Sequence, residues 1–120
     1  MGGGCGRYYL IEGDGSVYPC DFYVLDEWRM GNIQTDSFFK LEKSHTGIDF
    51  IKSSVYTWPD CLACPWHGLC RGGCRRDREP FVAGRPGPNR WCESYQALFE
   101  YAYTRMRTMA QAIAERGRLM

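Results

Sequence analysis

Seven cysteines are the residues of this sequence best suited to chemistry. Five of them fall between residues 61 and 92, and the densest run has the spacing Cys61-x2-Cys64-x5-Cys70-x3-Cys74. Four thiolates so close along a chain fit either a tetrahedral zinc ion or an iron-sulfur cluster. The seven positions are Cys5, Cys20, Cys61, Cys64, Cys70, Cys74 and Cys92.

The number of cysteines helps to choose between these metals. One closed zinc site uses four ligands and would leave three of the seven thiols idle. Two iron-sulfur clusters with four cysteines each need eight thiols, only one more than the chain has. In bacterial two-cluster ferredoxins the last cysteine of the tight run ligates the other cluster, and Cys74 could cross over in the same way. The cysteines therefore favour two clusters, with zinc as the alternative and a disulfide scaffold disfavoured by the odd number.

Composition limits the other classes of function. The chain has 120 residues, enough for one domain, and 15 basic residues against 14 acidic ones give a net charge of +1. This balance provides no general attraction to nucleic acid or to an anionic membrane, and the apolar runs are too short to cross a bilayer. We therefore expect neither a nucleic-acid partner nor a membrane partner.

A β-hairpin from about residue 7 to 20 is expected to position two of the thiols. Two aromatic and β-branched runs, 8–12 and 17–20, are separated by the turn sequence Gly13-Asp14-Gly15-Ser16. Pairing these strands would bring Cys5 and Cys20 to the same end of the hairpin. From residue 21 to 33 we expect irregular structure.

The rest of the sequence predicts short helices, a cysteine-rich loop and a long helix. Capping residues near Ser37 indicate a helix to about residue 43, and a second, weaker pattern indicates one over 45–53. The many prolines and glycines of residues 57–91 make regular structure unlikely there, so this loop should wrap around a metal group. Apolar residues spaced three and four apart predict an amphipathic helix over 93–116 that packs in a core or an interface. The predicted fold is a small α+β domain over 1–99, with a C-terminal helix, 93–120, packing on it or extending from it.

The complete cysteine pattern resembles SPASM domains, the auxiliary-cluster modules of radical S-adenosylmethionine (radical SAM) peptide maturases. Details around it look particularly like anaerobic sulfatase-maturating enzymes, and the resemblance runs from about residue 5 to 99. The motifs that carry it are Cys5-x9-Gly15-x4-Cys20, the run from Cys61 to Cys74, Cys92, Val17-Tyr18-Pro19-Cys20-Asp21-Phe22-Tyr23-Val24, Gly31-Asn32-Ile33 and Cys70-Arg71-Gly72-Gly73-Cys74.

The resemblance implies two 4Fe-4S clusters with separate ligand sets. Cys5, Cys20 and Cys74 would hold the first cluster, and the second would be held by Cys61, Cys64, Cys70 and Cys92. In sulfatase-maturating members the fourth ligand of the first cluster lies six residues before the position of Cys5, which falls upstream of Met1. We therefore expect this chain to be a fragment. The radical SAM core, with its S-adenosylmethionine and a third 4Fe-4S cluster, would lie in the same full-length chain or in a separate polypeptide.

The reaction implied by the resemblance oxidises a Cys or Ser of a sulfatase polypeptide to formylglycine. Asp21 matches the carboxylate proposed as the base in that family, and an auxiliary cluster would accept the substrate electron. The 120 residues alone should be inactive, and the clusters imply a cytoplasmic location. The alternatives are a SPASM module of another peptide maturase, a small zinc-stapled binding protein and a free-standing electron carrier.

Six arginines lie within residues 71–90, where the acidic residues are Asp77 and Glu79. A 4Fe-4S cluster with four thiolates is itself negatively charged, so nearby arginines would offset its charge or raise its potential. His67 also lies between ligand positions, but the cysteine pattern is complete without it. The arginines are Arg71, Arg75, Arg76, Arg78, Arg85 and Arg90.

Overall fold

The computed structural model describes residues 4–6 and 8–117 and divides into two compact units. The first unit ends at Arg90 and the second begins at Trp91. Residue 7, where the hairpin was predicted to begin, lies outside the described residues. No helix of the described residues is both long enough and apolar enough to cross a membrane.

The predicted hairpin is present as a pair of short antiparallel strands, β1 (Leu10–Ile11) and β2 (Ser16–Tyr18). The Asp14 carboxylate tightens the turn by accepting hydrogen bonds from the Ser16 backbone nitrogen and hydroxyl, both at 2.9 Å. Gly15 has a φ of +83°, and a Cβ there would lie 2.6 Å from the Asn32 Oδ1 atom. A side chain at Gly15 would therefore be strained and would also clash with the neighbouring strand.

The prediction of irregular structure over 21–33 is partly wrong. Two 3-10 turns occur, η1 (Asp21–Tyr23) and η2 (Asp26–Trp28), and then β3 (Gly31–Asn32) pairs with β2 to complete a three-stranded sheet in the order β1-β2-β3. A two-residue strand that includes a glycine shows no hydrophobic alternation, so its pairing comes from backbone contacts distant in sequence.

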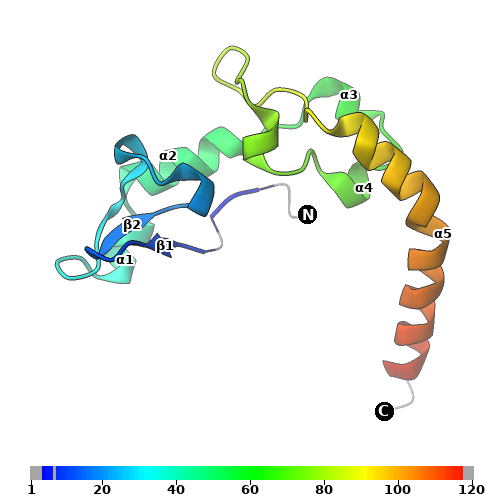
Figure 1. The fold of residues 1–120 in the computed structure, drawn as a ribbon, viewed down its shortest axis with the longest axis horizontal. Coiled ribbons are helices and arrows are strands. Elements are labelled where there is room, and N and C mark those ends of the chain that lie inside the picture. Colours follow the sequence, from blue (N-terminus) through cyan, green and yellow to red (C-terminus); the bar gives the residue numbers. More distant parts are fainter. Residues whose placement is uncertain (1–3, 7, 118–120) are drawn as a thin grey trace. The chain divides into compact units, whose positions relative to one another are not determined.

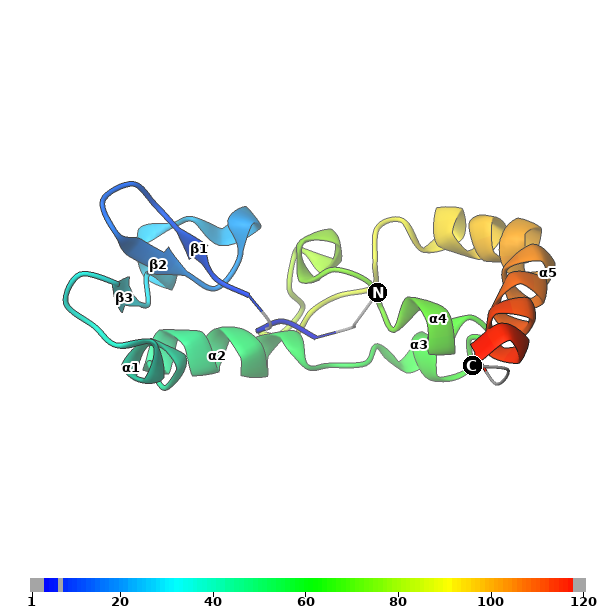
Figure 2. The same cartoon turned by 90° about the horizontal axis from the view of Figure 1, so that it is seen from below.

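Two capped helices follow the sheet, as predicted: α1 (Phe38–Glu42) and α2 (His45–Ser54). The Ser37 hydroxyl accepts a hydrogen bond from the Lys40 nitrogen at 3.3 Å, and the Ser44 hydroxyl accepts one from the Gly47 nitrogen at 3.1 Å. Both serines therefore satisfy amides that a helix start leaves unpaired. Figure 2 shows the two helices along one side of the sheet.

Asp36 joins β3 to α1 and makes this connection sensitive to acid. Its carboxylate accepts from the Asn32 nitrogen at 2.9 Å and pairs with the Lys40 Nζ atom at 2.5 Å. The hydrogen bond from Lys40, and then that from Asn32, hold the pKa of Asp36 below its ordinary value. Its stabilising effect is thus present above the ordinary pKa of an unfolded aspartate, about 4, and is lost as the pH falls through the lowered folded pKa.

We predict that Asp36→Asn lowers the thermal midpoint of the chain at pH 7, and that the difference shrinks as the pH falls below about 4, the ordinary pKa of aspartate. Thermal unfolding followed by circular dichroism from pH 2 to 7 measures the difference between the two proteins. A difference that is constant across this range would show that the Asp36 charge does not contribute.

The core of the first unit is small and aromatic. Phe50 is fully buried and makes edge-on contacts with the rings of Tyr23, at 5.0 Å between centroids, and Trp28, at 5.1 Å. Cys20 is buried in the same cluster, and Cys5 packs against it. The core therefore includes two of the predicted metal ligands.

Residues 57–91 contain more regular structure than predicted. Two helices of one turn occur, α3 (Pro59–Leu62) and α4 (His67–Cys70), followed by the 3-10 turn η3 (Arg75–Arg78). Figure 1 shows these turns joined by irregular loops. Pro59 is the first residue of α3, where its missing N–H has no helical partner to lose, so the proline begins a helix instead of preventing one.

The second unit consists mainly of α5 (Cys92–Gly117), within one residue of the predicted helix at each end. Phe99 is buried and stacks with Tyr95, with 6.2 Å between ring centroids. Met106, Met109 and Ile113 of the predicted apolar stripe are exposed. These three residues therefore lie outside the core, and packing in an interface stays a prediction for them.

Candidate iron-sulfur site

All seven cysteines lie within the described residues and are in the thiol form. Cys20 is buried and the other six are half-buried. Six of the seven cysteines are therefore partly accessible to water. They lie before β1 (Cys5), after β2 (Cys20), in and after α3 (Cys61, Cys64), at the end of α4 (Cys70), before η3 (Cys74) and at the start of α5 (Cys92).

Cys5, Cys20 and Cys74, which we call the first thiol group, come from distant parts of the sequence. Cys5 packs against the aromatic cluster that holds Cys20, and the charge of Cys74 acts on the Cys5 thiol. The Cys5 nitrogen donates to the Ser54 hydroxyl at 3.3 Å, which ties this segment to the end of α2. Burial raises the pKa of both Cys5 and Cys20, so these thiols keep their protons until a bound metal displaces them.

Asp21 lies directly against this first thiol group. The Cys20 thiol donates a hydrogen bond to the Asp21 Oδ1 atom at 3.3 Å, and Asp21 is exposed at the start of η1. The predicted base is thus within contact of a predicted ligand while its carboxylate faces solvent. A metal that replaces the thiol proton would remove the donor of this hydrogen bond.

Tyr8 is a site residue that the sequence analysis missed. Its hydroxyl lies near the Cys20 thiol, and the charge of Cys20, followed by burial and the charge of Asp21, raises the pKa of Tyr8. The signal was in the hairpin register. Because Leu10 pairs with Tyr18, residue 8 falls opposite residue 20.

Cys61, Cys64 and Cys70, which we call the second thiol group, are positioned by consecutive backbone turns. The Cys64 nitrogen donates to the Cys61 carbonyl at 3.3 Å, and the His67 nitrogen donates to the Cys64 carbonyl at 3.1 Å. Cys92, which the resemblance also assigns here, belongs to the second unit, where its Sγ atom accepts a hydrogen bond from Gln96 Nε2 at 3.3 Å.

A left-handed turn lies between Cys70 of the second thiol group and Cys74 of the first. Arg71, Gly72 and Gly73 have consecutive φ values of +51°, +82° and +73°. Two adjacent glycines suit this conformation because an L side chain is strained there.

Asn89 holds this turn from the other side of the loop. Its side-chain Nδ2 donates to the Gly72 carbonyl at 3.0 Å, and Asn89 is buried. We predict that Asn89→Ala lowers the free energy of unfolding by about 1–3 kcal/mol, because the Gly72 carbonyl then loses a buried donor. Chemical denaturation of the metal-free chain measures the loss, with the exposed amide variant Gln34→Ala as control. Equal stability of the two variants would contradict this role.

Two buried arginines, Arg75 and Arg78, act electrostatically on the Cys5 thiol and lower its pKa against the effect of burial. Arg78 is only 2% exposed and donates from Nε to the Gly87 carbonyl at 3.3 Å and from Nη2 to the Tyr56 carbonyl. Burial lowers the pKa of this guanidinium, and thiols of both groups act in the opposite direction: Cys61, Cys5 and Cys70. A fixed cation thus lies within electrostatic reach of both thiol groups.

The donor set fits iron-sulfur clusters chemically. Thiolates are the usual ligands of such clusters, and here they are half-buried beside permanent positive charges that would offset the negative charge of a bound cluster. Within residues 4–6 and 8–117, no three His, Cys, Asp or Glu side chains are arranged to hold a single metal ion.

Comparisons with known proteins agree with this chemistry. The family model called SPASM, described as an iron-sulfur cluster-binding domain, matches residues 5–65. The cysteine-type anaerobic sulfatase-maturating enzyme of Clostridium perfringens is 45% identical over 113 residues, 94% of this chain and 30% of that protein. The enzyme of the same name from Clostridium novyi is 42% identical over 116 residues, 97% of this chain and 31% of that protein.

A solved structure shows the same fold. "Native anSMEcpe with bound AdoMet and Cp18Cys peptide" is 44% identical and superimposes with a TM-score of 0.88, covering 94% of this chain and 31% of that one. The chain thus spans about a third of the length of the relatives it matches. On the family match and the shared fold, this chain belongs to the SPASM family of iron-sulfur cluster-binding domains.

Proposed function

We propose that this chain is the auxiliary-cluster part of a radical SAM enzyme that oxidises a sulfatase side chain to formylglycine. The observation that carries the proposal is the contact of Asp21 with Cys20, because it places a candidate base beside a candidate cluster ligand. The identity of 45% with a relative named cysteine-type favours Cys over Ser as the substrate residue.

The proposed ligand sets follow the resemblance. The first cluster takes the first thiol group, Cys5, Cys20 and Cys74. The second takes Cys61, Cys64, Cys70 and Cys92. Support for the first set comes from the packing of Cys5 against the core that holds Cys20, and from the charge interaction between Cys5 and Cys74.

Asp21 would remove the heteroatom proton of the substrate. Its exposure leaves the carboxylate accessible to a polypeptide substrate, and proton transfer requires such a group within hydrogen-bond reach. Iron binding at Cys20 would also take away the thiol proton that Asp21 now accepts, which leaves the Oδ1 atom available for another donor. Tyr8, which the strand register sets opposite Cys20, would help to orient this end of the hairpin.

The remaining parts of the reaction lie elsewhere in the proposed enzyme. When bound, the auxiliary clusters would accept the electron that the substrate radical must lose. Hydrogen abstraction would need a radical SAM core with S-adenosylmethionine and a third 4Fe-4S cluster, in the same chain or in a separate polypeptide. Such clusters are sensitive to oxygen, so we propose a reducing cytoplasm as the compartment.

A chimeric enzyme tests this function. This chain would replace the matching 113-residue segment of the Clostridium perfringens enzyme, and formylglycine formation would be measured on a Cys-containing sulfatase peptide by mass spectrometry. We expect maturation at a rate within about tenfold of the parent. A chimera with full iron and sulfide content that cleaves S-adenosylmethionine but forms no formylglycine would assign the module to another peptide maturase.

A further inference from the structure

Arg75 occupies an unusual position for a charged residue, because it is only 6% exposed and is surrounded by aromatic rings. Its guanidinium carbon lies 4.4 to 4.9 Å from four ring centroids. Cation–π contacts of this kind stabilise a positive charge most strongly when water is excluded. The four rings are those of Tyr23, Trp28, Phe50 and Phe81.

The hydrogen bonds of Arg75 leave its charge uncompensated. Nη1 donates to the Phe50 carbonyl at 3.1 Å and to the Ser53 hydroxyl at 2.5 Å, whereas Nε is buried without a hydrogen-bond partner. No salt bridge to Arg75 occurs within the described residues. A buried guanidinium without an anion is costly, so this position favours a nearby negative group.

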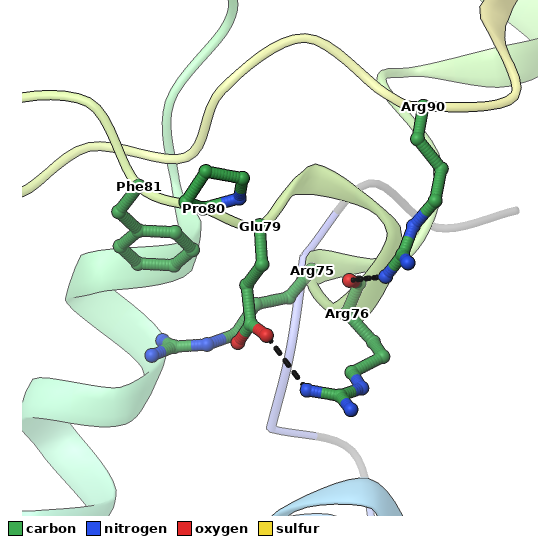
Figure 3. Close-up of a pocket in the computed structure, with 6 residues that line it drawn as sticks. All are labelled: Arg75, Arg76, Glu79, Pro80, Phe81 and Arg90. Atoms are coloured by element: carbon green, nitrogen blue, oxygen red, sulfur yellow. Dashed lines mark hydrogen bonds and ion pairs between the residues drawn. The ribbon is translucent and has the colours of Figure 1, made fainter.

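The pocket beside Arg75 holds one carboxylate, and this carboxylate forms its salt bridge with a different arginine. Arg75 lines an open pocket of about 470 Å³ with Arg76, Glu79 and Arg90, shown in Figure 3. Glu79, the acidic residue of this lining, pairs with Arg76 at 2.7 Å and accepts a hydrogen bond from the Tyr23 hydroxyl at 2.5 Å. The Glu79 carboxylate is therefore shared between Arg76 and the Tyr23 hydroxyl, and it forms no salt bridge with Arg75 within the described residues.

Arg75 acts electrostatically on one member of the first thiol group, because its charge lowers the pKa of Cys5 against the effect of burial. Arg75 directly follows Cys74, and two of its four rings, those of Tyr23 and Phe50, form one buried cluster with Cys20. Cys5 and Trp28 pack against the same cluster. The rings thus hold the guanidinium in a fixed place within electrostatic reach of the Cys5 thiol.

We propose that Arg75 is the fixed counter-charge of the cluster bound by Cys5, Cys20 and Cys74, and that it makes this cluster easier to reduce. The inference rests on the proposed cluster binding. A one-electron reduction makes a 4Fe-4S centre more negative, and a permanent positive charge in a low-dielectric site stabilises that state and raises the reduction potential. Arg75 is thus a positioning residue: by raising the reduction potential of the first cluster, it makes that cluster the more favourable acceptor of the substrate electron.

The test uses the full 120-residue chain, reconstituted anaerobically with iron and sulfide, and a redox titration followed by electron paramagnetic resonance. Arg75→Gln and Arg75→Met remove the charge and keep much of the side-chain volume, whereas Arg75→Lys keeps the charge. Arg76→Gln, an exposed charge one residue along, is the matched control. We expect a more negative midpoint for one cluster in both neutral variants, recovery of most of that shift by lysine, and a smaller shift in the control.

Loss of the first cluster in both neutral variants with retention in Arg75→Lys also supports the inference, since charge alone separates these proteins. An unchanged midpoint in Arg75→Gln, an equal shift in Arg75→Lys and Arg75→Gln, or loss of the cluster in all three variants would overturn it. A wild-type chain that takes up no sulfide would overturn the proposed cluster binding itself, which is a distinguishable failure.

Discussion

Replacing Asp21 with asparagine in the chimeric enzyme should lower formylglycine formation by about 100-fold or more, the usual effect of removing a general base. Asparagine has nearly the same shape and can still accept a hydrogen bond from Cys20, but it cannot take the substrate proton. The rate of product formation per enzyme, measured by mass spectrometry at saturating peptide, gives the effect.

Asp26 provides the matched control for this experiment, because it also begins a 3-10 turn and is also exposed. Asp26→Asn should keep the parental rate. Iron and sulfide content must be equal in both variants, so that loss of a cluster is not mistaken for loss of the base. An Asp21→Asn chimera with a full complement of clusters and an unchanged rate would remove Asp21 from the proton-transfer role.

Cysteine replacements should remove the clusters one at a time. We expect Cys74→Ala to lose the first cluster and Cys64→Ala to lose the second, each with a fall of about half in the iron bound by the chain, because each would hold a separate 4Fe-4S unit. Iron and sulfide analysis of the reconstituted variants measures the loss. His67→Ala, which changes a residue between ligand positions, should retain the wild-type content.

The same series tests the crossover of Cys74 to the other ligand set. Cys5→Ala and Cys74→Ala should remove the same electron paramagnetic resonance signal, whereas Cys61→Ala and Cys70→Ala should remove the other. The left-handed turn over residues 71–73 separates Cys70 from Cys74 and makes this division possible. If Cys74→Ala and Cys70→Ala remove one common signal, the two ligand sets are wrong.

The sequence predicted those helices and strands that are determined by residues close to one another along the chain. The Ser37 cap, the turn at Gly13–Ser16 and the three- and four-residue spacing of α5 each depend on residues close in sequence, and the structure confirms the elements they predicted. The α+β fold class followed from these elements. The thiol spacing likewise pointed to a metal-binding domain before any fold was known.

Features made by contacts between distant segments were not predictable in this way. β3 forms because Gly31 and Asn32 meet the edge of β2, and no periodicity marks two residues. The aromatic surroundings of Arg75 come from segments up to 58 positions apart, from Tyr23 to Phe81, so the sequence indicated only a local excess of arginine. Tyr8 was foreseeable only from the strand register, which places it opposite Cys20.

The most direct test of cluster binding is the metal and sulfide content of the purified chain after anaerobic reconstitution. We predict several iron atoms per chain, a matching amount of acid-labile sulfide, and broad visible absorption that is lost when Cys20 and Cys64 are both replaced by alanine. About one equivalent of zinc per chain, without sulfide and without visible absorption, would contradict the account and identify a zinc-stapled domain instead.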